Sequence, residues 1–152
     1  MVVRLSDGIG LVGPLVLAGR STCLRCMDLH RAAHDRHWPT VVASLTGRVG
    51  SASPATTMAT AALAAEQALL VLDSLVIPGQ PPPTLDAVLE LDTRRGELRR
   101  RRWAPHADCD CGAAHIWRED RRHGYPTRGE VSPKEESTPG LGRLPCEEVA
   151  AQ

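Results

Sequence analysis

Cys23-Leu24-Arg25-Cys26 and Cys109-Asp110-Cys111 are the two stretches that decide the fold of this chain. Each stretch places two thiols in one tight turn, and two such turns together offer the four sulfur ligands of a tetrahedral zinc ion. The sequence therefore predicts a metal site that joins distant parts of the chain, with four ligands: Cys23, Cys26, Cys109 and Cys111. Since four thiolates fill the coordination sphere, we expect the zinc to be structural rather than catalytic.

Other uses of these cysteines fit the sequence less well. A thioredoxin-like pair is disfavoured because no βαβ unit surrounds Cys23, and haem attachment is disfavoured because Met27 rather than histidine follows Cys26. The fifth cysteine, Cys146, lies in a polar tail and has no assigned role. Four histidines lie close to the cysteines in sequence and are substitute ligands: His30, His34, His37 and His106.

Length and composition indicate one domain with an aliphatic core. The chain has 152 residues, 42% of them hydrophobic but only 3% aromatic. Its 18 basic and 18 acidic residues balance, so net charge argues for neither a nucleic-acid nor a membrane partner. No signal peptide is visible, and the apolar run Ala59–Leu72 is interrupted by Glu66-Gln67 and is too short to span a bilayer. We therefore expect a cytoplasmic protein, in which paired cysteines serve more often as metal ligands than as disulfides.

The first part of the chain predicts a hairpin followed by short helices. Asp7-Gly8 supplies the turn of a hairpin that runs from Val2 to Leu17. Gly8, Gly10 and Gly13 match the dinucleotide-binding fingerprint in letters, but the following Pro14–Gly19 segment is not helical in pattern, so we expect no nucleotide there. A short helix is expected from Cys23 to about Ala33, capped by Ser21 or Thr22. A second one is expected over Thr40–Leu45, with Pro39 in its first turn.

The middle of the chain predicts one long helix, from the Ser53 cap to about Leu75. One side carries an apolar stripe, and Leu63, Leu70 and Val71 make the opposite side apolar too. A helix that is apolar nearly all round is a buried one, so we expect the core helix here. The stripe consists of Met58, Ala62, Ala65, Leu69, Leu72 and Val76.

A second hairpin is expected from Leu85–Leu91 and Glu97–Trp103. The returning strand carries four consecutive arginines, Arg99, Arg100, Arg101 and Arg102, which alternate between the two faces of a strand. We interpret them as a charged edge that resists aggregation, and a phosphate or acidic-peptide contact is the alternative. Nucleic-acid binding is disfavoured because Trp103 is the only aromatic neighbour available for stacking. After residue 117 charged residues, Gly, Pro and Ser dominate, and we expect 118–152 to form a disordered tail.

The order of these parts resembles the C-terminal half of the ThiF/MoeB adenylyltransferases, which are similar to ubiquitin-activating enzymes. Three stretches carry the resemblance: Gly13–Cys26 with the first cysteine pair, Ser53–Leu69 with the long helix, and Leu89–Gly112 with the hairpin and second pair. Within that family the chain most resembles the actinobacterial ThiF-like branch, which includes cyclodehydratase and leader-peptide-binding proteins. The resemblance covers residues 2–112, and the family's ATP-binding Rossmann half has no counterpart in this sequence.

The resemblance implies a fold and two hypotheses of function, and the arginines of the second hairpin suggest a third. The fold class is α/β, in detail an α+β fragment with antiparallel hairpins and one long buried helix, in a zinc-binding domain over 1–117. We expect a scaffold or dimerisation module, either a homodimer or bound to a partner biosynthetic enzyme or peptide. The alternatives are a component of an adenylyltransferase or cyclodehydratase whose ATP and magnesium site lies on another chain, and a basic-strand nucleic-acid binder. Alone, the chain is expected not to adenylate.

Overall fold

The computed structural model describes residues 1–76 and 81–122, and these form an antiparallel sheet with helices on either side. The sheet has the order β1-β2-β3-β4, with strands β1 (Val3–Ser6), β2 (Ile9–Val12), β3 (Ala87–Asp92) and β4 (Glu97–Arg102). The helices are α1 (Leu24–His34), α2 (Trp38–Leu45), α3 (Pro54–Val76) and α4 (Ala113–Arg122). The prediction of mixed α and β structure with antiparallel hairpins is confirmed.

Each hairpin turns where the sequence placed glycine. Asp7 and Gly8 both have positive φ angles, 52° and 82°, which is the backbone geometry that joins two strands with only two residues. The first hairpin is shorter than we predicted, since β2 ends at Val12 instead of continuing to Leu17. Gly13 follows at φ 108° and lies against the carbonyl of Ala87, a position that no side chain could share. No helix follows Gly13 directly, as the pattern of Pro14–Gly19 predicted, and the first helix begins at Leu24.

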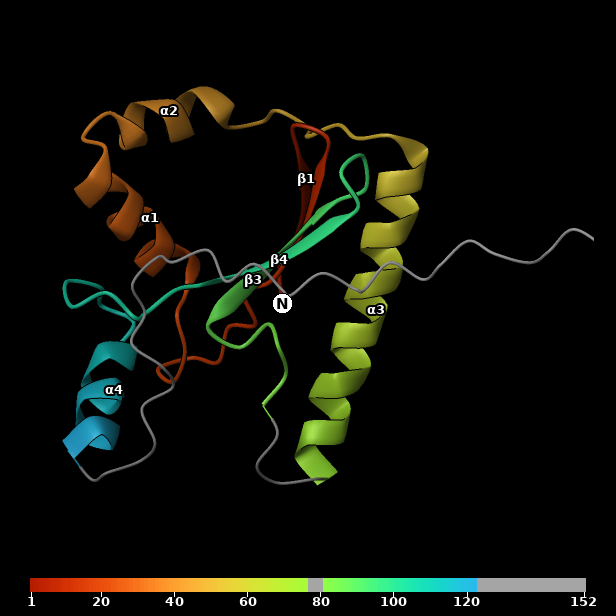
Figure 1. The fold of residues 1–152 in the computed structure, drawn as a ribbon. Helices are drawn as coiled ribbons and strands as arrows, with labels where there is room; N and C mark the ends of the chain where they lie inside the picture. Colours follow the sequence, from red (N-terminus) through yellow and green to blue (C-terminus); the bar gives the residue numbers. More distant parts are fainter. Residues whose placement is uncertain (77–80, 123–152) are drawn as a thin grey trace, which may run out of the picture.

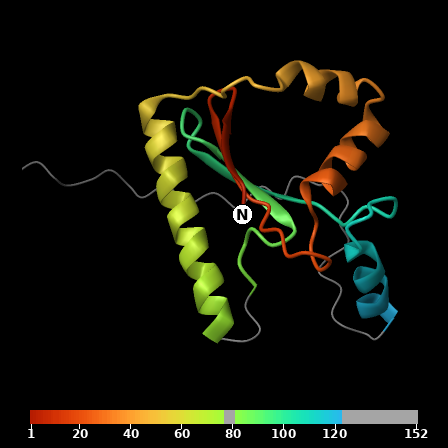
Figure 2. The ribbon, with the colours of Figure 1, turned by 180° about the vertical axis from the view of Figure 1, so that it is seen from behind.

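The long helix stands on one side of the sheet, while α1 and α4 stand on the other (Figure 1 and, from behind, Figure 2). Its predicted start is confirmed, because the Ser53 hydroxyl accepts the backbone N–H of Thr56 at 3.1 Å. It packs mainly on β2, and the contact is close at Gly10. A Cβ at Gly10 would collide with the Thr60 side chain, so glycine is what permits this approach.

The prediction that α3 is buried nearly all round is wrong. The residues that face the sheet are mostly small or polar, and Thr56, Thr60 and Gln67 are 1%, 2% and 4% exposed. The Thr60 hydroxyl is satisfied inside the helix, where it donates to the Thr56 carbonyl at 2.6 Å. The described members of the predicted stripe, from Met58 to Leu72, lie on the other side and are exposed. The hydrophobicity of the sequence could not predict which side of α3 is buried, because α3 carries apolar residues on nearly all of its sides.

By length and composition, α3 could also cross a membrane. Residues Pro54–Ser74 form a 21-residue stretch with a mean hydropathy of 1.4, so our expectation that this run is too short to span a bilayer was wrong. The core helix of a soluble protein meets the same criterion. Here Thr56, Thr60 and Gln67 pack against the sheet instead, so α3 contributes polar groups to the protein interior.

Helix α4 was not anticipated. It starts directly after the second cysteine pair and continues through Arg118 to Arg122, so the boundary we predicted at residue 117 falls inside it. Gly112, with φ 80°, turns the chain from the cysteines into the helix. The rest of the predicted tail, residues 123–152, lies outside the described residues, as does Cys146.

Candidate metal centre

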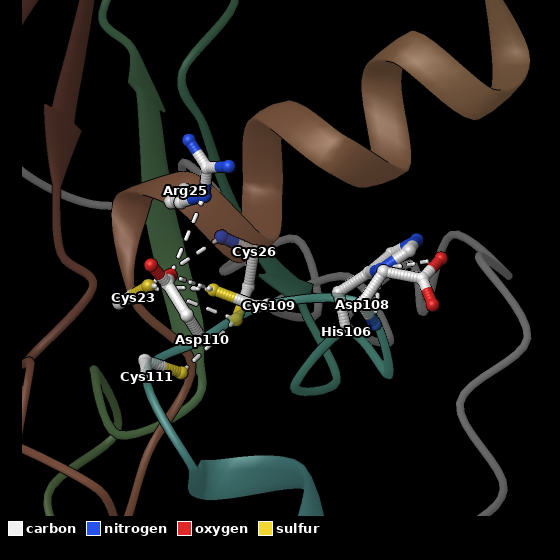
Figure 3. A network of polar contacts seen from close by, with 8 residues as sticks. All are labelled: Cys23, Arg25, Cys26, His106, Asp108, Cys109, Asp110 and Cys111. Atoms are coloured by element: carbon white, nitrogen blue, oxygen red, sulfur yellow. Dashed lines mark hydrogen bonds and ion pairs between the residues drawn. The ribbon is translucent and has the colours of Figure 1, made fainter.

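The four predicted cysteines converge on one point between α1 and the turn that leads into α4 (Figure 3). The Sγ atoms of Cys23 and Cys26 lie 3.7 Å apart, and those of Cys23 and Cys109 lie 3.6 Å apart. Cys26 Sγ and Cys111 Sγ are also 3.6 Å apart, and all four sulfurs lie within 4.8 Å of one another. The structure thus brings together all four cysteines that the sequence predicts as metal ligands.

These spacings fit a single ion at the centre of the sulfurs. A zinc–sulfur bond of about 2.3 Å in a tetrahedron gives sulfur–sulfur edges of about 3.8 Å. The three Sγ–Sγ distances of 3.6–3.7 Å are close to that value. No disulfide joins these four cysteines. Cys26 and Cys109 are buried and the other two are half-buried, so the cluster is largely shielded from water. Four cysteines in this arrangement can hold a metal ion.

Helix α1 begins at the first cysteine. Cys23 itself caps the helix, and its Sγ accepts the backbone N–H of Cys26 at 3.5 Å. Our prediction that Ser21 or Thr22 provides the cap is therefore wrong. A sulfur acceptor at this position satisfies a free helix N–H and turns Sγ towards Cys26, so capping and ligand placement use the same atom.

Ser21 and Thr22 instead fix the first cysteine turn to the sheet. The backbone N–H of Thr22 donates to the carboxylate of Asp86 at 2.7 Å, and its hydroxyl donates to the carbonyl of Trp103 at 2.6 Å. The Ser21 hydroxyl donates to the Leu15 carbonyl at 3.1 Å. Thr22, Ser21 and Asp86 are 0%, 1% and 9% exposed. Sequence reasoning missed this support because Asp86 and Trp103 come near Cys23 only in the folded chain.

The four histidines predicted as substitute ligands lie outside the sulfur cluster. His30 Nε2 hydrogen-bonds the carbonyl of Ala104 at 2.9 Å, and its ring meets the His106 ring edge to face at 4.7 Å. His106 Nδ1 accepts the backbone N–H of Asp108 at 3.1 Å. His30 and His106 therefore shape the chain around the second cysteine turn, and the ligand set of the cluster is all-cysteine.

The thiols of the cluster differ in acidity. Burial raises the pKa of Cys109 to about 12, and burial likewise raises the pKa of Cys111. Burial also opposes ionisation of Cys26, but main-chain hydrogen bonds with His106 and Cys23, together with the neighbouring thiols, outweigh it and lower its pKa. Four thiolates this close would repel one another strongly. The positive charge of a bound metal ion would offset this repulsion, and its binding would release the thiol protons.

Charged side chains add little at the rim of the cluster. Arg25 and Asp110, one from each cysteine turn, form an ion pair with Nε and Oδ1 at 3.5 Å (Figure 3). Their side chains are 66% and 86% exposed, so solvent screens the pair and it contributes little to stability.

An arginine between two indoles joins α1 to the neighbouring segments. The guanidinium of Arg31 lies 4.9 Å from the ring centre of Trp38 and 5.0 Å from that of Trp103. Asp28 accepts from both Arg31 and the Trp38 indole N–H, at 3.3 and 3.2 Å. Burial lowers the pKa of Arg31 below its usual range. These contacts hold α1 against α2 and the chain after β4.

Three arginines of β4, Arg99, Arg100 and Arg101, make polar contacts within the chain. Arg101 pairs with Glu90 on the adjacent strand and Arg99 with Glu97, both at 2.8 Å. Arg100 Nε donates to the Pro83 carbonyl at 2.8 Å. A hollow of about 160 Å³ lies beside them, smaller than the roughly 300–1,000 Å³ of typical ligand pockets. It is lined by Pro81, Leu85, Asp86, Arg100, Arg102, Trp103 and Trp117.

No protein-family model, curated protein or solved structure matches this chain.

Proposed function

We propose that this chain is a protein-interaction module whose fold is held together by one structural zinc ion. The observation that carries the proposal is the cluster of four cysteines with edges of 3.6–3.7 Å. Thiolates in a tetrahedral set select zinc or iron, and the short edges suit one ion rather than a multinuclear cluster. With four protein ligands no position remains for a reacting water or substrate, so the metal contributes structure rather than catalysis.

The second support for an interaction role is the outward side of α3. Met58, Leu69 and Leu72 are 74%, 56% and 59% exposed, and they lie on one side of one helix. Apolar side chains gathered in this way mark binding surfaces in soluble proteins. A reducing cytoplasm, which keeps thiols available for a metal, is the compartment we propose.

The resemblance to the C-terminal half of ThiF/MoeB proteins agrees with this role. In the ThiF/MoeB family the adenylation chemistry belongs to the Rossmann half, which the resemblance does not cover. We therefore propose that the module acts by binding, and that any adenylation in its pathway is performed by another chain.

Cobalt replacement tests the ligand set. We expect one Co²⁺ per chain and an intense thiolate-to-cobalt charge-transfer band, because all the ligands are sulfur. His30→Ala and His106→Ala are the matched variants: both should leave the band position and intensity unchanged, since these rings lie outside the cluster. A blue-shifted, weakened band in either variant would show mixed cysteine and histidine ligation.

Two measurements test the interaction role. The zinc-loaded chain should show no ATP–pyrophosphate exchange when assayed alone, and it should bind a hydrophobic dye or associate in analytical ultracentrifugation. Exchange above the background of a Cys26→Ser preparation contradicts the proposal, because it would make the chain an adenylyltransferase. A monomer that binds no dye also contradicts the proposal, because the outward side of α3 would then not act as an apolar binding surface.

A further inference from the structure

The outward side of α3 repeats with the period of a coiled coil. Its apolar residues are spaced alternately four and three positions apart, which is the spacing of the facing positions in a heptad. Thr60 and Gln67, seven residues apart, lie on the opposite side and are buried against the sheet. We name this outward surface the α3 seam, which consists of Met58, Ala62, Ala65, Leu69 and Leu72.

Every residue of the α3 seam is exposed. Ala61 and Ala68, which flank the seam on one side, are exposed too, and they allow another backbone to approach closely. The other flank carries Glu66 and Asp73, and α3 contains no basic residue. A helix packed lengthwise on the seam would therefore meet alanine on one side and two carboxylates on the other.

We propose that the α3 seam pairs with the α3 seam of a second copy of this chain, in antiparallel orientation. In that register Ala62 meets Leu72 of the second copy and Ala65 meets Leu69, so a small residue faces a large one in each layer. A parallel pair would stack alanine on alanine and leucine on leucine, leaving gaps in one place and crowding in the next. Antiparallel helices also oppose their macrodipoles favourably. This inference rests on the proposed function, for which it names the partner.

The size of the surface predicts the strength of the pair. From Met58 to Leu72 the seam is about 21 Å long, and two such helices bury on the order of 1,000 Å² in total. That area is at the lower end of specific interfaces. We therefore expect a reversible, concentration-dependent dimer rather than an obligate one.

A lipid surface suits the seam less well. Helices that lie in a membrane interface usually carry lysine and arginine beside their apolar side, to meet anionic headgroups. The charges beside the α3 seam are both acidic, Glu66 and Asp73. Crossing the bilayer would additionally require Thr60 and Gln67 to leave the sheet, which buries them.

The position of Glu66 distinguishes an antiparallel pair of α3 helices from a parallel pair. In the antiparallel pair it lies close to the two-fold axis and faces Glu66 of the second copy, whereas in a parallel pair it faces Ala61. Like charges at that position weaken the dimer, and salt screens them. The antiparallel pair should therefore tighten as salt is raised, and Glu66→Gln should tighten it further and remove most of the salt effect.

Sedimentation velocity of the zinc-loaded chain over the micromolar range tests the proposal. We expect a monomer–dimer equilibrium that Leu69→Glu and Leu72→Glu each weaken by about tenfold or more, because each removes a buried leucine from the interface. Leu45→Glu is the matched control: Leu45 is 51% exposed on α2, away from the seam, and its replacement should leave the equilibrium unchanged. Cobalt spectra confirm that each variant keeps its fold.

Five outcomes would contradict the antiparallel pairing of two α3 seams. A dimer that is indifferent to Leu69→Glu and Leu72→Glu uses another surface, and a dimer unaffected by Glu66→Gln is not antiparallel. Binding to phosphatidylcholine–phosphatidylglycerol vesicles that Leu69→Glu abolishes assigns the seam to lipid. A monomer that still binds hydrophobic dye overturns the second copy but leaves the interaction module standing, whereas a monomer without dye binding contradicts both.

Discussion

Cys26→Ser abolishes the cooperative unfolding transition of this domain. Cys26 is fully buried, and its thiolate would be one of four metal ligands. Structural zinc sites contribute roughly 10–16 kcal/mol of binding free energy in small domains. This is as large as the whole stability of a typical domain, about 5–15 kcal/mol. Because serine is a poor zinc ligand, we expect a chain without a cooperative melt, followed by circular dichroism during heating.

Two matched experiments separate the metal from the side chain. Cys146→Ser makes the same chemical change at a cysteine that is not among the four proposed ligands, and we expect it to melt like the parent chain. Chelation of the parent should reproduce the Cys26→Ser behaviour, and added zinc should reverse it. A Cys26→Ser variant that melts cooperatively near the parent temperature would show that packing alone supports the fold.

Asp86→Ala destabilises the domain by about 3 kcal/mol, from two separable causes. The first is the loss of the carboxylate that accepts the buried Thr22 N–H at 2.7 Å, since an unpaired buried donor costs about 1–3 kcal/mol. The second is backbone strain, since Asp86 has φ 52° and alanine is about 1 kcal/mol less stable there. Urea unfolding of the zinc-loaded variant measures the sum.

The variants Asp86→Asn and Asp86→Gly separate the two causes of this loss of stability. Asp86→Asn keeps an acceptor oxygen and a residue that tolerates positive φ, so it should cost least. Asp86→Gly relieves the backbone but not the missing acceptor, so it should lie between Asn and Ala. Since Thr22 precedes Cys23, we also expect Asp86→Ala to weaken zinc affinity by about 10–100-fold in chelator competition. Equal stabilities of the Ala and Asn variants would remove Asp86 from the support of the metal site.

The four candidate metal ligands and the turns of the hairpins could be predicted because their signals are local. Cys23 and Cys26 lie in one turn, and Asp7-Gly8 specifies a two-residue hairpin whatever surrounds it. The long helix was predicted within a residue at each end, because Ser53 and Pro54 mark its start so clearly. In each case, residues a few positions apart carry the information.

The orientation of α3 and the support of the metal site could not be predicted, because both depend on distant partners. Which side of α3 is buried is decided by Gly10, whose missing side chain lets Thr60 approach the sheet. The role of Thr22 is decided by Asp86, 64 positions away in the chain. Helix α4 was not predicted because its composition is similar to the composition of the polar sequence that follows it.

The order of the strands has a consequence for how the chain folds. Two residues join β1 to β2, and a short turn joins β3 to β4. Each pair of strands can therefore form within microseconds. β2 and β3 are neighbours in the sheet, yet α1, α2 and α3 all lie between them in the chain. Their pairing must await the closure of a long loop, which makes this non-local step the slow one. We expect a metal ion bound early to Cys23 and Cys26 to bind the second cysteine pair and shorten that search, so that zinc raises the folding rate as well as the stability.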